Sequence, residues 1–244
     1  MKDFVDAFKF MGDNLDLLVN KTVEHLELSG AAIGVALVIA LPIGLWLGHM
    51  HRGSFIAINV ANIGRALPSL AVIAILLGTL GIGFVNVMVA LVVLAVPPIL
   101  TNAYLGIDQV ERDTVQAAEG MGMRPWQVFM RVELPISLPL VFAGIRTSAV
   151  YVVATATLAA IAGGGGLGDI IVNQASYKLA GVIAAAIWVA ALALLVDGAF
   201  GLLQRAVTPR GLRRAAAMSD APPPDAGASA PVVAGRPVPG AEIN

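Results

Sequence analysis

The sequence contains no cysteine, and this absence excludes several kinds of functional site. Without thiolates the chain cannot form disulfides or zinc–thiolate sites, and it cannot use a cysteine nucleophile. Only three histidines are present, and His49 and His51 are two residues apart, which places them on different faces of a helix. We therefore expect no metal site in this chain.

Charged residues are also scarce. They make up 13% of the 244 residues, whereas a typical soluble domain has about 25%. The formal net charge of −1 gives no strong field of either sign, so we expect no nucleic-acid partner. Apolar residues reach 58% and the mean hydropathy is +0.84, which together indicate an integral membrane protein in contact with lipid.

Five charge-poor stretches are each long enough to cross a membrane as a helix, which takes about 20 mostly apolar residues. Lipid offers no hydrogen-bond partners to an open backbone, so we expect an all-α polytopic fold. The predicted spans are 28–48, 56–80, 84–104, 140–162 and 179–203. The sequence Gly81-Ile82-Gly83 predicts a tight turn between the second span and the third.

The placement of Lys and Arg near the span ends predicts the orientation, because cytoplasmic segments carry more of them. With the N-terminus outside, the cytoplasmic segments carry Arg52, Arg112, Arg124, Arg131, Arg205, Arg210, Arg213 and Arg214. The outer segments then carry Lys2, Lys9, Lys21 and Lys178. We therefore expect a multi-pass protein of the cytoplasmic (inner) membrane with its N-terminus outside and its C-terminus inside.

The two ends of the chain differ from the transmembrane domain, which we place at 28–204. Segment 1–27 has apolar residues at helical spacing among charges, which predicts an amphipathic extracytoplasmic helix on the membrane surface. Segment 209–244 is rich in Pro, Ala and Gly and cannot bury a core, so we expect a disordered cytoplasmic tail.

Glycines recur in two places with different expected roles. In the first span, Gly30, Gly34, Gly44 and Gly48 predict close packing against another helix. A second group lies at the outer end of the fourth span and predicts a flexible turn or a close-packing element near a gate, the simple turn being the plainer interpretation. This group comprises Gly163, Gly164, Gly165, Gly166 and Gly168. It matches G-x-G-x-x-G, but no strand precedes it, so we reject a dinucleotide site.

Two charged residues lie in or near the last two spans, where charges are costly and usually pair or face the bundle interior. Arg146 belongs to the fourth span and Asp197 to the fifth. We expect an intramembrane ion pair between them.

The predicted cytoplasmic loop at 107–138 is longer than the other connections and contains signals for two short helices. Asp113 and Gln116 predict a helix start with a capping box. Gly120 or Gly122 can end this helix, and a second helix can begin at Pro125 and stop before residue 135. The small residues on the first helix suit docking into a groove of another protein. An ordinary re-entrant connector fits the residues equally well.

The same loop resembles the coupling loop of bacterial ABC-importer permeases, whose pattern is E-A-A, three residues, G, nine residues, I-x-L-P. Gln116-Ala117-Ala118 and Gly122 match the first half, with Gln in place of the first Glu. Nine residues later, Val132-Glu133-Leu134-Pro135 matches the second half with Val in place of Ile. The resemblance implies contact with an ATPase through Gln116, Ala117, Ala118, Glu119, Gly120, Gly122, Leu134 and Pro135.

The wider resemblance, over residues 22–204, is to permeases for osmoprotectants of the glycine betaine, carnitine and choline type. Segments 22–28, 66–71, 143–147 and 157–168 carry it. It implies a type I ABC importer permease fold and a transport subunit that is not an enzyme. The implied partners are ABC ATPase subunits that use ATP and Mg, an extracytoplasmic substrate-binding protein, and a second permease chain, identical or similar.

The chain itself has no G-x-x-x-x-G-K-[ST] loop to cradle ATP phosphates, so we expect it to bind no cofactor. Its three Trp and three Tyr are scattered and predict no aromatic cage for a quaternary ammonium, so selection of the solute falls to the binding protein. A permease for methionine or another amino acid is the nearest alternative. A secondary transporter is a remote one, because five spans do not divide into equal inverted halves.

Overall fold

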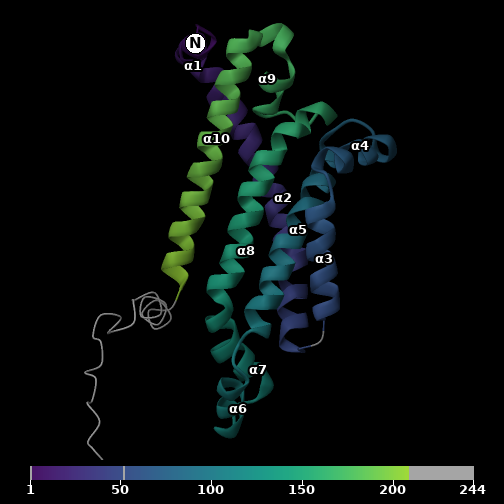
Figure 1. Cartoon of the computed structure of the whole chain (residues 1–244), viewed down its shortest axis with the longest axis vertical. Helices are drawn as coiled ribbons and strands as arrows, with labels where there is room; N and C mark the ends of the chain where they lie inside the picture. The colour runs from purple at the N-terminus through teal and green to yellow at the C-terminus, as the bar shows by residue number, and fades with distance from the viewer. Residues whose placement is uncertain (1, 52, 209–244) are drawn as a thin grey trace, which may run out of the picture. The chain divides into compact units, whose positions relative to one another are not determined.

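The computed structural model describes residues 2–51 and 53–208, and all regular elements among these residues are helical (Figure 1). In chain order the α-helices are α1 (Lys2–Asp13), α2 (Leu15–His49), α3 (Ser54–Ala66), α4 (Ser69–Leu80), α5 (Phe84–Asp108), α6 (Arg112–Gly120), α7 (Pro125–Val128), α8 (Leu134–Thr155), α9 (Gly168–Val172) and α10 (Gln174–Val207). A π-helical turn, η1 (Phe129–Glu133), leads into α8, and a 3-10 helix, η2 (Ala156–Ala162), follows it. The predicted tail at 209–244 lies outside the described residues.

Within residues 2–51 and 53–208, four helical segments are long and apolar enough to cross a membrane. They are α2, α5, the run from α7 to η2 (Pro125–Ala162), and α10. They contain four of the five predicted spans. In α10 the backbone is kinked at Lys178 (φ 56°), directly before the predicted start of the last span.

The fifth predicted span, 56–80, is not one continuous helix. It is divided into α3 and α4, which meet at 90° and count as a fifth span only if the bent pair is taken together. The break falls at Leu67, whose backbone is extended (ψ 115°). Leu67 precedes Pro68, whose ring disfavours helical backbone in the residue before it. Hydropathy registers the length of an apolar run but not a change in its direction.

The predicted boundary at residue 27 is also not a boundary in the structure. Only α1 is a separate helix, and its Phe4 and Phe8 are exposed, as suits an amphipathic helix on a membrane surface. From Leu15 onward the chain is already in α2, which has 35 residues. At 1.5 Å per residue α2 is about 52 Å long, which exceeds the roughly 30 Å of hydrocarbon core. The charged first turns of α2 therefore extend beyond the apolar stretch without ending the helix.

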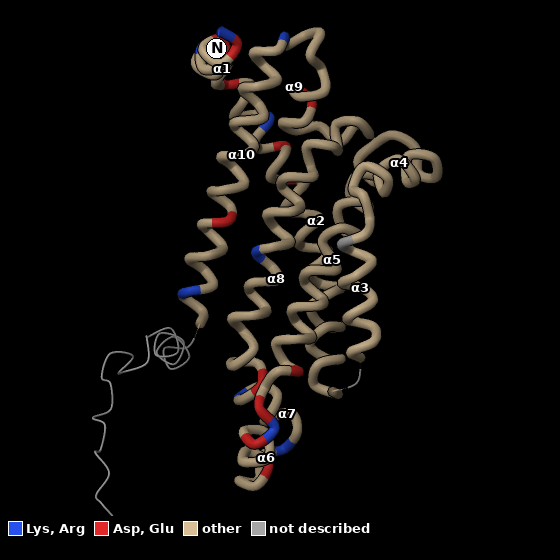
Figure 2. The backbone as a smooth tube through the Cα atoms, in the orientation of Figure 1, with Lys and Arg blue, Asp and Glu red and all other residues tan. Residues whose placement is uncertain are grey.

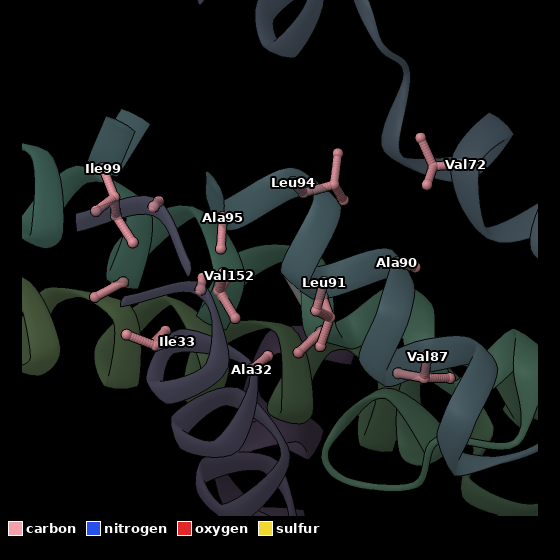
Figure 3. Packing of buried hydrophobic residues seen from close by; sticks show 14 of the residues in the cluster. Ala32, Ile33, Val72, Val87, Ala90, Leu91, Leu94, Ala95, Ile99 and Val152 are labelled. Carbon is pink, nitrogen blue, oxygen red and sulfur yellow. The ribbon is translucent and has the colours of Figure 1, made fainter. Parts of the chain in front are cut away.

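The core is built where α2, α5 and α8 pack together. Figure 3 shows Ala32 of α2, Leu91 of α5 and Val152 of α8 close together in this cluster. On α2, small residues recur every four positions and are fully buried, which brings the backbones of α2 and α5 near one another. Helices pack closely here because their side chains are short.

The glycines of α2 divide into two pairs. A methyl group added at Gly44 would lie 2.6 Å from the carbonyl oxygen of Leu100, and one at Gly48 would lie 2.8 Å from that of Tyr104. Methyl groups at Gly30 and Gly34 would meet nothing within 4 Å. The predicted packing role therefore holds for Gly44 and Gly48, and it is wrong for Gly30 and Gly34 within this chain.

Candidate functional site

Helices α6 and α7 lie together at one end of the bundle, between the last turn of α5 and the first turn of α8 (Figure 1). Charged residues gather at this end, whereas the long helices carry few (Figure 2). We call residues 111–135 the coupling segment. Its charge places it outside the hydrocarbon layer, where it is accessible to a partner protein.

The first helix of the coupling segment begins two residues earlier than predicted. Its N-cap residue is Glu111, and no side chain caps it, so the predicted capping box of Asp113 and Gln116 is wrong. The backbone N–H groups of Thr114 and Val115 donate instead to the carbonyl of Glu111. Because α6 starts at Arg112, Asp113 lies within the first turn, where its charge interacts favourably with the helix dipole.

The small residues of α6 do not all face outward. Gln116, Ala117, Glu119 and Gly120 are exposed, whereas Ala118 is buried. The exposed residues form one open face of α6. Ala118 instead packs the helix against the rest of the coupling segment.

Gly122 ends α6 in a left-handed conformation. Its φ is +81°, and its N–H donates to the carbonyl of Glu119 at 2.8 Å. A methyl group at this position would meet nothing within 4 Å. Backbone conformation rather than space therefore requires glycine here.

The second half of the coupling segment runs directly into α8. The helix begins at Pro125, and the backbone N–H of Arg124 donates to Gln127 Oε1 at 2.8 Å. The predicted stop before residue 135 is wrong, because the chain continues through η1 into Leu134 and Pro135 of α8. In η1 the N–H of Leu134 donates to the carbonyl of Phe129. This wider turn accommodates Pro135, which lacks an N–H and whose ring crowds the preceding turn of a regular helix.

A contact that the sequence did not reveal joins the coupling segment to the end of α2. His49 Nδ1 lies 2.6 Å from Glu133 Oε2, and Glu133 is 1% exposed. The His49 ring packs against Phe129 with centroids 5.2 Å apart, and Phe129 packs against Trp126. A cavity of about 520 Å³ lies beside these rings. The sequence offered two weak signals for this contact. Glu133 stands between two apolar residues, and His49 stands at the end of an apolar run.

Arg146 of α8 and Asp197 of α10 are paired as expected. Arg146 Nε and Nη2 donate to the two carboxylate oxygens of Asp197, each at 2.6 Å. Gly201 lies next to the guanidinium, since a methyl group there would be 3.3 Å from Nη1. The side chains are about one-third exposed and line a cavity of about 670 Å³. The two-pronged geometry joins α8 to α10 at a charged point within two long apolar helices.

The glycine run lies at the opposite end of the bundle from α6 (Figure 1). We call residues 163–168 the glycine loop. Gly163, Gly165 and Gly166 have φ between 74° and 76°, a region that favours glycine. Methyl groups at Gly164 and Gly168 would collide with η2. The loop is thus closely packed by its neighbours, which favours the close-packing interpretation over a free turn.

Residues near the start of α2 hold the glycine loop. Glu24 Oε2 accepts from the N–H of Gly166 at 3.1 Å, and Lys21 bridges Glu24 and Asp169 at 2.8 Å each. The ring of His25 lies against Gly166, while its Nε2 is 2.8 Å from the carbonyl oxygen of Val153. This contact ties α2, α8 and the glycine loop together.

A further cavity of about 620 Å³ opens between α3, α5 and α8. Its polar lining residues are Thr101, Asn102, Thr147 and Tyr151. Residues 2–51 and 53–208 contain no group of three or more His, Cys, Asp or Glu that could hold a metal ion.

Similarity to known proteins was assessed against sequences and against solved structures. Over 205 residues the chain is 40% identical to the glycine betaine/carnitine/choline transport system permease protein OpuCB of Bacillus subtilis (strain 168), covering 84% of this chain and 94% of that protein. It is 39% identical to the choline transport system permease protein OpuBB of the same organism, covering 84% and 95%. It is 38% identical to the carnitine transport permease protein OpuCB of Listeria monocytogenes, covering 84% and 95%.

Among solved structures, an inward-facing MetNI methionine ABC transporter matches with a TM-score of 0.68 and 25% identity, covering 80% of this chain and 98% of that one. The all-helical fold of a type I ABC importer permease, expected from the resemblance, is confirmed. Residues 40–209 match the family described as binding-protein-dependent transport system inner membrane component. The chain therefore belongs to this family of permease subunits and is a multi-pass protein of the inner membrane.

Proposed function

We propose that this chain is the permease subunit of an ABC importer that moves a small osmoprotectant, such as glycine betaine, carnitine or choline, across the cytoplasmic membrane. The observation that carries the proposal is 38–40% identity, over 84% of the chain, to permeases named for these solutes. The structure named for methionine is less similar, at 25% identity. An amino-acid substrate is therefore the weaker alternative.

The coupling segment is the proposed docking site for an ABC ATPase, which binds and hydrolyses ATP with Mg while this chain binds no cofactor. The exposed face of α6, at a charged end of the bundle, supports this role. Gly122 fixes the end of α6, and the continuous path through η1 into α8 provides a stiff connection to a long apolar helix. Residues Leu134 and Pro135 begin that helix.

This proposal places α6 in the cytoplasm and the glycine loop on the outer side, with the N-terminus outside and the C-terminus inside. The glycine loop is then the proposed outer gate, next to an extracytoplasmic substrate-binding protein. The Arg146–Asp197 pair is the proposed intramembrane ion pair, and a second permease chain completes the pathway. The partly exposed charges of this pair support a position facing a water-filled path or that second chain rather than lipid.

Reconstitution into vesicles with the ATPase and the binding protein tests the proposal. We expect labelled glycine betaine to enter only with ATP, and unlabelled choline or carnitine to compete while methionine does not. Competition by methionine alone would support the amino-acid alternative. Uptake that continues without the ATPase would identify a secondary transporter and overturn the proposal.

A further inference from the structure

Helix α2 contacts both proposed moving parts of the permease, although it is continuous with neither in the chain. At one end, His49 bonds Glu133 of the coupling segment across 84 residues of sequence. At the other end, Glu24 bonds the N–H of Gly166 in the glycine loop across 142 residues. A single helix of 35 residues joins these two contacts.

The contact at the coupling segment is specific because Glu133 is buried. A buried carboxylate is strongly destabilised unless it is paired and hydrogen-bonded. His49 Nδ1 lies 2.6 Å from it, and within residues 2–51 and 53–208 the carboxylate makes no other hydrogen bond or ion pair. A displacement of Glu133 must therefore either carry the end of α2 with it or leave the carboxylate buried without its partner.

The position of Glu133 in the chain also suits a moving contact. It is the last residue of η1, the π-helical turn between α7 and α8. Such turns are uncommon and recur at functional sites, because their wider hydrogen-bonding pattern differs from that of the helix around them. The Phe129 ring from the same turn packs on His49. Both contacts to the end of α2 thus come from η1.

Helix α2 is continuous and packed against its neighbours along its length, as transmission of a displacement requires. It remains helical through Pro42, between the buried Ala40 and Gly44. Gly44 and Gly48 bring its backbone against α5. At the far end, Lys21 and Glu24 bond to Asp169 and the glycine loop, and the His25 ring lies against Gly166.

We propose that α2 transmits motion between the two ends of the permease. In this scheme the His49–Glu133 contact passes displacement of the coupling segment to α2, and α2 passes it to the glycine loop. The inference rests on the proposed function, because it requires that ATP hydrolysis moves the coupling segment. His49 is a positioning residue in this scheme. It contacts neither solute nor ATP, and it acts through Glu133.

Two substitutions at His49 separate the hydrogen bond from the ring. His49→Phe keeps a ring against Phe129 but removes the ring nitrogen that bonds Glu133. His49→Asn removes the ring but places an amide N–H close to the position of Nδ1. The matched control is His51→Phe, because His51 lies 3.3 Å from Asp108, the last residue of α5, and both side chains are partly exposed.

The first measurement is the amount of glycine betaine imported for each ATP hydrolysed by the reconstituted full complex. Coupling free energies between two sites typically correspond to about 5- to 150-fold effects, so we expect His49→Phe to lower this ratio by about fivefold or more. His49→Asn should restore much of it, and His51→Phe should leave it unchanged. A purely structural role would lower import and ATP hydrolysis together, along with the yield of assembled complex.

The second measurement follows the glycine loop directly. The chain has no cysteine, so a single Ile161→Cys substitution next to the loop gives one labelling site, and Ile161 is exposed. We expect the rate of maleimide labelling to change when ATP and vanadate are added, and this change to disappear with His49→Phe while ATP hydrolysis continues.

The outcomes distinguish the inference from the proposed function. If the wild-type complex shows no ATP-driven import, the proposed function fails. If the wild-type complex imports and His49→Phe keeps both the transport ratio and the labelling change, the inference about α2 is overturned while the proposed function stands. If His49→Phe prevents assembly, Glu133→Met is measured in the same way. This variant removes both carboxylate oxygens, one of which bonds His49, and keeps a side chain of similar length, so an unchanged transport ratio would again overturn the inference.

Discussion

At the residue scale, Gly122 shows how one backbone conformation supports a docking surface. Its positive φ ends α6 and turns the chain toward Arg124, so the exposed face of α6 depends on it. The surrounding space is open, so a substitution acts through the backbone and not through a collision.

We expect Gly122→Ala to reduce ATP-coupled transport while membrane insertion stays normal. A left-handed conformation costs a non-glycine residue about 1–2 kcal/mol, which would loosen the end of α6. The control is Gly78→Ala, which lies inside α4, outside the coupling segment, where a methyl group also meets nothing within 4 Å. Uptake and limited proteolysis of the coupling segment measure the effect. Equal behaviour of the two variants would contradict this account.

The Arg146–Asp197 pair is a second feature that acts at single residues. We expect Asp197→Asn to lower the melting temperature of the detergent-solubilised permease, because the guanidinium loses its charged partner. The double variant Arg146→Met with Asp197→Leu should recover stability, since neither charge is then left alone. If the double variant is stable but inactive in transport, the pair has a role in the pathway. If Asp197→Asn melts as the wild type does, the pair does not stabilise the fold.

At the element scale, the α2–α5 contact depends on which glycines face a neighbour. We expect Gly44→Ala to destabilise the permease, because its new methyl group would lie 2.6 Å from the Leu100 carbonyl oxygen. Overpacking of this kind typically costs about 1–3 kcal/mol. Gly34→Ala, in the same helix but facing open space, should be neutral in the isolated chain. Thermal melting of the two purified variants compares them directly.

Much of the element order could be read from the sequence, because apolar runs of sufficient length have one stable form in lipid. The turn at Gly81 and Gly83 was predicted correctly, since both adopt positive φ between α4 and α5. The 90° bend at Pro68 and the unbroken passage into Pro135 were not. In both cases the proline itself could be seen in the sequence, but its effect on the helix could not. Before Pro135 the helix continues through a wider π-helical turn, whereas before Pro68 the helix ends at an extended residue.

The candidate site divides in a similar way. The coupling segment could be recognised because its pattern is local and continuous, from Gln116 to Pro135. The Arg146–Asp197 pair could be predicted from the sequence because charges in apolar helices need partners. The contacts of His49 with Glu133 and of Glu24 with Gly166 were missed. They join residues far apart in sequence, and hydropathy does not indicate which faces of α2 meet which loops.

At the scale of the whole molecule, the proposed orientation gives a prediction that needs no partner protein. The cysteine-free chain allows one reporter at each end, Ala117→Cys on α6 and Ile161→Cys beside the glycine loop. In intact cells an impermeant maleimide should label Cys at position 161, and it should label position 117 only after the membrane is opened. The reverse pattern would place the N-terminus inside and exclude the glycine loop as an outer gate.

The length of α2 also has a consequence for how the protein is made. Its first turns and its last residue are synthesised early, yet their partners Gly166, Asp169 and Glu133 follow 142, 148 and 84 residues later. During biogenesis α2 therefore lies in the bilayer before these partners have been synthesised. In that interval Lys21, Glu24 and His49 are solvated at the headgroups on either side. The first helix to insert is then among the last to reach its final contacts. A chain truncated after α5 should consequently insert but be recognised by quality-control proteases as unfinished.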